Sequence, residues 1–238
     1  MSSLNGASVI VAGATGGLGA PLSQLLAEAG AKLTLTARRP DGLAALPPEV
    51  LSTGTVAIPA DLCKPQAAQT VVDAAMRAHG RIDGVVCAIG AVAFGPAMEL
   101  PDQVLIDLFT LNTLAPIRLL KAAYPHLLAS AEQGRAPFVI NISAVVAEQP
   151  TPGMAGYAAS KSALTAFDRS AARELRRKGI RLIDVRPPHT ETGLAERPVY
   201  GHAPRLPRGL PPRTVAKRIV GAITEGDSDV PSGAFILG

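Results

Sequence analysis

The sequence predicts an α/β protein in which helices cover both faces of a parallel sheet of about seven strands. Short apolar runs rich in Val, Ile and Leu alternate with longer helix-forming stretches, which is the pattern of strand–helix–strand units. A glycine-rich turn directly follows the first apolar run. The length of 238 residues suits one domain with a sizeable core. We therefore expect a single doubly wound domain over residues 1–238.

Composition narrows the class of protein. Hydrophobic residues make up 47% of the chain and aromatic residues only 3%, so the core is expected to consist of Ala, Val, Leu and Ile. No apolar run approaches the roughly 20 residues of a membrane span, and the first residues lack the features of a signal peptide. We expect a cytoplasmic protein without a membrane partner. Cys63 and Cys87 belong to no metal-like cluster, which indicates neither a metal site nor a disulfide.

The chain is basic, with a net charge of +4 and a pI near 9.3, so a polyanionic partner has to be considered. Most basic residues, however, are dispersed arginines without interleaved aromatic residues. The cluster 173–178 comes late in an expected helix, where cations favour the helix dipole. We interpret it as a solvated helix face and expect no nucleic-acid partner.

A phosphate-binding turn is expected at the first strand-to-helix connection. The run 8–12 predicts a buried strand, and residues 20–29 predict a helix. Gly13, Gly17 and Gly19 lie between them. Glycines let the backbone approach a pyrophosphate, whose charge is met by free amides and the positive helix end. The spacing differs from GxGxxG, because three residues separate the first pair. Its place directly after the first strand nevertheless predicts a Rossmann-type dinucleotide site.

The end of the second strand indicates which dinucleotide is preferred. The run 31–37 predicts this strand, and Arg38 and Arg39 follow it. A carboxylate at this place binds the ribose hydroxyls of NAD, whereas arginine accommodates the 2′-phosphate of NADP. The sequence therefore predicts NADP(H). The alternative is that the two arginines are merely exposed residues that end a strand.

The remaining elements continue the alternation. The helical stretch 101–130 is expected to bend near 112–116, because Pro116 removes a backbone donor and crowds the preceding turn. The segment of about 188–211 is rich in proline and glycine, and is expected to be a lid or binding loop. Further strands are expected within 55–60, 81–88, 138–143, 180–186 and 233–237, and further helices within 64–79, 156–178 and 214–225.

Three residues late in the chain suggest proton-transfer chemistry. Tyr157 and Lys161 are four residues apart, so on a helix the ammonium stands beside the phenol. A nearby cation stabilises a phenolate, and moving a tyrosine pKa from near 10 to about 7 takes roughly 4 kcal/mol. Ser143 ends a predicted strand, where ligands bind in open α/β sheets and where its hydroxyl can hold a carbonyl oxygen. Considered alone, Tyr157 and Lys161 fit a solvated surface helix better.

The order of these motifs resembles the short-chain dehydrogenase/reductase family along essentially the whole chain. The resemblance implies that Tyr157 transfers the substrate proton and that Ser143 holds the substrate carbonyl or hydroxyl. Lys161 is implied to bind the nicotinamide ribose and to lower the tyrosine pKa. Asn112 is implied to anchor a water that extends the proton relay. No metal takes part. The matching positions are Gly13, Gly17, Gly19, Asp61, Ala88, Gly90, Asn112, Ser143, Tyr157, Lys161, Pro187 and Thr192.

Cofactor contacts are expected along the same edge, and two positions depart from the family pattern. Cys87 stands where the family usually has Asn, and Pro188 where it usually has Gly. Neither position belongs to the proton-transfer set. The expected NADP(H) contacts are Gly13, Thr15, Gly16, Gly17, Leu18, Gly19, Arg38, Arg39, Asp61, Leu62, Ala88, Gly90, Tyr157, Lys161, Pro187, Thr190 and Thr192.

These observations predict an NADP-dependent reductase of carbonyls or dehydrogenase of alcohols that acts on a small molecule. A non-catalytic NADP(H)-binding sensor or partner subunit is the alternative, and the complete catalytic set argues against it. A third reading is a nucleotide-sugar epimerase or dehydratase of the extended branch of the family. It needs a larger C-terminal substrate domain, for which we expect no room in 238 residues. The substrate stays unassigned, although His189 in the lid is expected nearest the nicotinamide. The resemblance suggests a homodimer or homotetramer formed through the helices after Asn112 and at 156–178.

Overall fold

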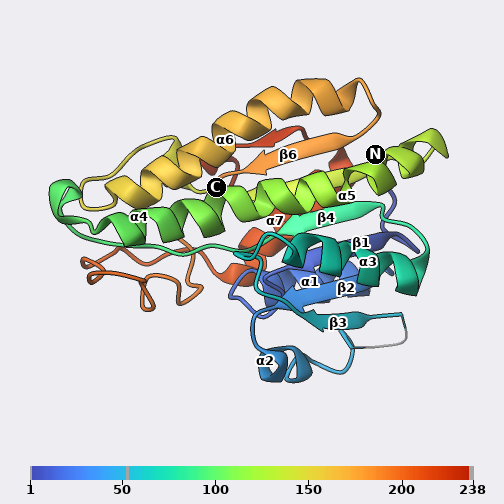
Figure 1. The fold of residues 1–238 in the computed structure, drawn as a ribbon, viewed down its shortest axis with the longest axis horizontal. Coiled ribbons are helices and arrows are strands. Elements are labelled where there is room, and N and C mark those ends of the chain that lie inside the picture. The colour runs from blue at the N-terminus through green and yellow to red at the C-terminus, as the bar shows by residue number, and fades with distance from the viewer. Residues whose placement is uncertain (1, 52–53, 236–238) are drawn as a thin grey trace.

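Seven parallel strands form one sheet in the computed structural model, which describes residues 2–51 and 54–235 (Figure 1). The order of strands across the sheet is β3-β2-β1-β4-β5-β6-β7. This arrangement confirms the predicted doubly wound fold. The strands are β1 (Ser8–Ala12), β2 (Lys32–Ala37), β3 (Val56–Pro59), β4 (Gly84–Cys87), β5 (Phe138–Ile142), β6 (Arg181–Val185) and β7 (Asp229–Val230).

Helices bury both faces of the sheet (Figure 1). Alternate side chains of each strand point to opposite faces. In β1, Val9 and Val11 join the core under α1 and α7, whereas Ile10 joins the core under α3 and α5. Because both faces are covered, the strands are continuous apolar runs in the sequence. The helices are α1 (Gly19–Glu28), α3 (Ala67–His79), α5 (Ala115–Glu132), α6 (Ala155–Arg176) and α7 (Pro212–Glu225).

The strand order reverses between β1 and β4. β1 pairs with β2 on one side and with β4 on the other, so the chain first builds outward to β3 and then returns to the centre. The loops after β1 and β4 both lie at the carboxyl edge of this switch point, where ligands bind in such sheets. The glycine-rich turn and residues 88–90 are those two loops.

The helical stretch before α5 contains the predicted bend. α4 (Asp102–Phe109) continues into α5 through a π-helical turn at Thr110–Leu114, and Pro116 lies in the first turn of α5. A π turn inserts an extra residue and redirects side chains. Here it carries the fully buried Asn112. The regular α-helix is therefore interrupted where the break or bend was predicted, and the interruption is a π-helical turn.

One helix in the described part of the chain passes a membrane-span test by length and composition alone, a test that the core helix of a protein outside the membrane also passes. The continuous helical run Asp102–Glu132 is long and apolar enough to cross a bilayer by those two criteria, with a mean hydropathy of 1.3 in its most apolar window. In this structure Leu119, Ala123 and Leu127 of that run are completely buried in the core beside the sheet.

Two elements differ from the sequence expectations. The short helix α2 (Pro40–Ala44) was not predicted; its first turn contains a proline, whose fixed φ suits that position. The last strand is Asp229–Val230, and Ser232–Phe235 forms a 3₁₀ turn, so the strand predicted at 233–237 is wrong for its described part. Residues 236 and 237 lie outside the described residues. The apolar Phe235 is buried in the core, which explains the mistaken strand pattern.

Candidate active site

α6 places Tyr157 and Lys161 on its buried face, in its first two turns. Their side chains are 7% and 3% exposed. The start of the helix packs tightly against α4 and the segment before it, because a Cβ on Gly156 would lie 2.5 Å from a methyl carbon of Leu100 and 3.2 Å from one of Leu108. The absence of a side chain at Gly156 thus lets the helix enter the site closely enough to bring both residues under the loops.

Lys161 is a buried ammonium at the end of β5. Its Nζ donates a 2.7 Å hydrogen bond to the carbonyl oxygen of Ile142. Burial lowers the pKa of Lys161 to about 8, and the charges of Asp184, Cys87 and Asp168 act in the opposite direction. The ammonium and its neutral amine are therefore both accessible near pH 8.

The ring of Tyr157 packs in an apolar cluster. Val92 and Phe94 follow β4, Val146 follows β5, and Leu194 of the 188–211 loop packs against the same cluster. Burial raises the pKa of Tyr157. The pKa is therefore shifted in the direction opposite to the predicted lowering, because apolar groups enclose the phenol.

Ser143 lies one residue beyond β5, as predicted, and is 3% exposed. Its Oγ accepts a 2.9 Å hydrogen bond from Thr165 Oγ1 on α6. An accepted bond from Thr165 leaves the Ser143 proton free to be donated elsewhere. Sequence analysis missed Thr165, although its position four residues after Lys161 on the same helix face was an available signal.

Asn112, on the π-helical turn, is hydrogen-bonded both to the loop after β4 and to α6. Its Oδ1 accepts from the Ala91 amide at 2.8 Å, and its Nδ2 donates to the Ala91 carbonyl and to Ser160 Oγ, both at 2.9 Å. Ser160 Oγ donates in turn to the Tyr157 carbonyl at 2.8 Å. A Cβ on Gly90 would stand 3.3 Å from Asn112 Oδ1 and 3.4 Å from Lys161 Nζ. The π-helical turn at Thr110–Leu114, α6 and the loop after β4 thus bring their predicted residues together.

The glycine-rich turn folds back on itself without room for side chains. Gly13 has a φ of +80°, and a Cβ there would lie 2.6 Å from the Ala88 carbonyl oxygen. A Cβ on Gly19 would overlap the Gly13 carbonyl oxygen. A Cβ on Gly17 would lie 2.5 Å from Thr192. The bare backbone of this turn, at the start of α1, therefore fits the pyrophosphate of a dinucleotide.

The residues expected around the adenosine lie after β2 and β3. Arg38 and Arg39 are exposed directly beyond β2, and Thr15 of the glycine turn is within 3.4 Å of a Cβ built on Gly42 in α2. Asp61 follows β3, and its Oδ1 accepts from the Cys63 amide at 3.1 Å. Leu62 is buried in the core. Gly16 and Leu18 complete the turn.

Pro188 and Cys87, the two positions that depart from the family pattern, lie in ordered surroundings: a hydrogen-bonded turn and the buried interior of β4. Pro187 still accepts a 3.0 Å hydrogen bond from the Val145 amide, and the Pro188 carbonyl accepts from Thr190 Oγ1 at 2.8 Å. Cys87 is completely buried in β4, and burial raises its pKa to about 12, so it is an inert thiol.

His189 of the 188–211 loop lies beside an acidic residue. Its Nε2 is 3.7 Å from Glu191 Oε1, whose carboxylate also accepts from the Gly209 amide at 2.5 Å. A bridge between Thr190 and Leu210 joins the two ends of the loop, and a bridge between Ala93 and Tyr200 joins its middle to the segment after β4. His189 lines a hollow of about 420 Å³ in the loop, together with Glu196 and Arg208.

Comparisons with known proteins agree with this geometry. A family model described as short chain dehydrogenase matches residues 7–199. A short chain dehydrogenase of Pseudocercospora fijiensis is 31% identical, and the match spans 80% of this chain and 62% of the fungal protein. The 3-oxoacyl-[acyl-carrier-protein] reductase of Vibrio cholerae is 29% identical over 81% of this chain and 77% of its own length.

A solved structure shares the fold. The 3-ketoacyl-(acyl-carrier-protein) reductase of Brucella melitensis, complexed with NADH, superposes with a TM-score of 0.87 at 22% identity. The superposition covers 98% of this chain and 100% of that one. The two chains therefore share their fold.

Proposed function

This chain belongs to the short-chain dehydrogenase/reductase family, and we propose that it transfers a hydride between NADP(H) and a small carbonyl compound or secondary alcohol. The observation that carries the proposal is the grouping of Asn112 and Lys161 around Gly90, with Tyr157 on the same helix as Lys161 and Ser143 bonded to that helix through Thr165. The glycine turn lies across the switch point from them. A protein that only binds a dinucleotide does not need a tyrosine and a buried lysine at this edge.

The chain's own residues supply binding and proton transfer. When bound, the nicotinamide gives or takes the hydride. Ser143, whose Oγ accepts from Thr165, donates its proton to the substrate oxygen and orients it. In reduction the carbonyl carbon gains the hydride, and its oxygen takes the Tyr157 proton to form the alcohol. Lys161, whose ammonium is bonded to the Ile142 carbonyl, would bind the nicotinamide ribose. Val92, Phe94 and Leu194 exclude water around the phenol.

Cofactor titration followed by a turnover assay tests this function. We expect NADPH to bind in calorimetry and to be oxidised with at least one member of a panel of ketones, aldehydes and keto-acids. Binding without turnover across the panel would favour the sensor alternative. Absence of binding would contradict the assignment of the glycine turn.

Arg38→Asp is expected to weaken NADPH binding by about 10- to 100-fold, because one charge-assisted bond to the 2′-phosphate contributes roughly 1.5–3 kcal/mol. NADH affinity should change far less. Both dissociation constants are measured by calorimetry. Arg77→Asp, on an exposed arginine at the far end of α3, is the matched control. Equal loss for both cofactors would remove the phosphate-contact argument.

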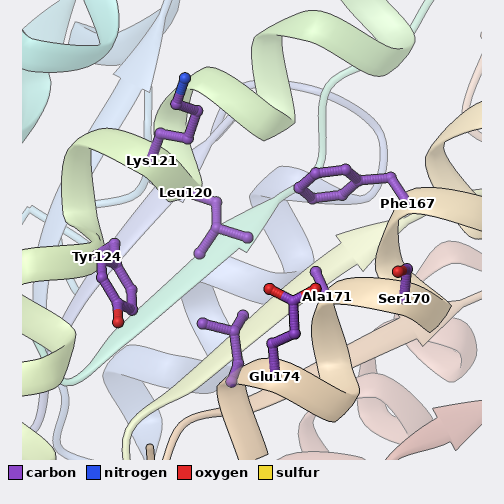
Figure 2. Close-up of a pocket in the computed structure, with 8 residues that line it drawn as sticks. Leu120, Lys121, Tyr124, Phe167, Ser170, Ala171 and Glu174 are labelled. Atoms are coloured by element: carbon purple, nitrogen blue, oxygen red, sulfur yellow. The ribbon is translucent and has the colours of Figure 1, made fainter.

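We also propose self-association through α5 and α6. A shallow groove of about 330 Å³ runs between these helices, and Figure 2 shows Leu120 and Tyr124 on one side with Phe167 and Ala171 on the other. The mixture of apolar and small side chains suits close helix packing. Its further lining residues are Lys121, Ser170, Glu174 and Leu175.

Ala171→Glu is expected to lower the mass measured by light scattering to that of one chain, 24.4 kDa, because it buries a charge at the contact. Arg173→Glu, on the opposite side of α6, is the control and should keep the oligomer. An unchanged mass for Ala171→Glu, with an unchanged circular dichroism spectrum, would contradict this interface.

A further inference from the structure

Two hydrogen bonds join the buried face of α6 to the end of β5. Lys161 Nζ donates at 2.7 Å to the carbonyl oxygen of Ile142, the last residue of that strand. One helical turn later, Thr165 Oγ1 donates at 2.9 Å to Ser143 Oγ, on the next residue of the chain. The first bond reaches the backbone. The second reaches the side chain that would hold the substrate oxygen.

The two hydroxyl groups of the second bond are buried together. Ser143 is 3% exposed and Thr165 is 4% exposed. Within residues 2–51 and 54–235, this bond is the one hydrogen bond that either side chain makes. A buried hydroxyl without a partner costs stability. Each of the two groups therefore depends on the other.

The backbone of Ser143 is fixed by its neighbours, but these bonds do not orient its side chain. The Ser143 amide donates at 2.8 Å to the carbonyl of Val185 on β6, and the Val145 amide donates at 3.0 Å to the Pro187 carbonyl. Rotation about the Cα–Cβ bond still offers a serine three staggered positions, and its hydroxyl proton also rotates. The bond from Thr165 is the contact that selects among these orientations.

Thr165 suits this task because its own side chain is restricted. Threonine is branched at Cβ, which leaves it few side-chain positions in a helix. A threonine in a helix commonly turns its hydroxyl to the carbonyl four residues earlier, which here belongs to Lys161. Thr165 donates to Ser143 on the adjacent segment instead. The helix thus presents a fixed donor to a side chain that would otherwise rotate.

The direction of the bond decides what Ser143 can do next. A hydroxyl group has one proton to donate and two lone pairs that accept. Because Thr165 donates, the bond uses one lone pair of Ser143 Oγ and leaves the Ser143 proton available. In the reverse direction this proton would be taken up by Thr165. A hydroxyl that accepts a hydrogen bond is also polarised by it, so it becomes a stronger donor.

We propose that Thr165 is a positioning residue, which holds the Ser143 hydroxyl in the orientation that donates to the substrate oxygen. The role rests on the proposed function, because it needs a carbonyl or hydroxyl oxygen at Ser143. Thr165 touches no reacting atom and acts through Ser143. It also lies outside the positions by which the chain matches the family pattern.

The contribution of Thr165 should appear mainly in kcat. During reduction the substrate oxygen becomes more negative as the hydride arrives, so a hydrogen bond donated to it is stronger in the transition state than in the bound substrate. An interaction of this kind lowers the barrier without tightening substrate binding equally. The loss of Thr165 Oγ1 should therefore slow turnover and leave KM nearly unchanged.

A double-mutant cycle of Thr165→Val and Ser143→Ala tests this role. Thr165→Val alone should lower kcat by about 3- to 10-fold, as the loss of one neutral hydrogen bond predicts. Ser143→Ala should be slower than wild type by about 10²- to 10³-fold, and adding Thr165→Val to it should cause no further loss. Single-turnover oxidation of NADPH at high protein concentration, with the best substrate of the carbonyl panel, measures these rates.

The same cycle is measured without cofactor or substrate by chemical denaturation. Thr165→Val should raise the unfolding equilibrium constant by about 3- to 10-fold, because Ser143 Oγ loses its buried partner. In Ser143→Ala the threonine hydroxyl has already lost its acceptor, so valine should cost little there. An equal cost in both backgrounds overturns the proposal, whatever the turnover.

Two further variants separate positioning from general stability. Thr165→Ser keeps the hydroxyl and should hold kcat within about twofold of wild type, although the lost methyl group destabilises the core. Ser130→Ala removes another buried hydroxyl, which donates at 2.8 Å to the Ile82 carbonyl before β4. It should also raise the unfolding constant, while kcat stays unchanged.

The outcomes that overturn the proposal are distinct from those that overturn the proposed function. An unchanged kcat in Thr165→Val contradicts the role of Thr165, as does an equal fall of kcat in the presence and absence of Ser143. A Thr165→Ser variant as slow as Thr165→Val assigns the effect to the methyl group and also contradicts it. If the wild type turns over no carbonyl compound, the proposed function fails, and this catalytic role fails with it.

Discussion

Tyr157→Phe is expected to lower kcat by about 10²- to 10⁴-fold, because the substrate oxygen loses its proton donor or acceptor. Cofactor affinity should be retained. The phenol hydroxyl makes no hydrogen bond to the described part of the chain, and the ring packs against Val92, Phe94 and Val146. A phenylalanine fills the same space, so the free energy of unfolding should change by less than about 1 kcal/mol.

The measurements are steady-state rates with the best substrate of the carbonyl panel, calorimetry with NADPH, and thermal unfolding. Tyr124→Phe, in the groove between α5 and α6, is the matched control, because it removes a phenol hydroxyl far from the site. Wild-type turnover in Tyr157→Phe would refute the proton-transfer role. Loss of cofactor binding together with turnover would show that the substitution disturbed the crevice instead.

Much of the fold follows from local sequence patterns. The glycine turn, the strand ends and the placement of Ser143 depend on short stretches whose apolar periods and glycines are visible in the chain. A parallel sheet brings all carboxyl ends to one edge, so residues predicted at the ends of β1, β4 and β5 necessarily meet there. The bend near Pro116 was likewise visible, because proline acts locally.

The electrostatics of the site depend on contacts that no local pattern contains. Burial raises the pKa of Tyr157, and part of the apolar cluster around its ring comes from Leu194, far along the chain. Asp184 and Asn141 look like ordinary strand residues until the register of β5 and β6 places them side by side. Pairing with β6 also places the last strand at Asp229–Val230 instead of at 233–237. The Asp229 carboxylate there accepts a hydrogen bond from Arg186.

Gly19→Ala is expected to cost about 3 kcal/mol of unfolding free energy and to weaken NADPH binding more than 100-fold, because overpacking against rigid backbone is not relieved by a rotamer change. The added Cβ would overlap the Gly13 carbonyl oxygen and lie 3.0 Å from the Ala14 Cα. The turn must open to admit it, and the backbone amides then no longer converge on a pyrophosphate. Chemical denaturation and calorimetry measure the two effects.

Gly221→Ala is the matched control for the intrinsic effect of alanine in a helix. It lies inside α7, and the nearest atoms to its Cβ belong to the flexible side chain of Glu225, at 3.3 Å. Alanine there should raise stability by about 0.5–1 kcal/mol. Gly19 is the first residue of α1, so at most this gain applies to Gly19→Ala, and a net loss is due to the clash. A Gly19→Ala variant as stable as Gly221→Ala, with unchanged NADPH affinity, would show that the turn is not the closed cradle that this geometry describes.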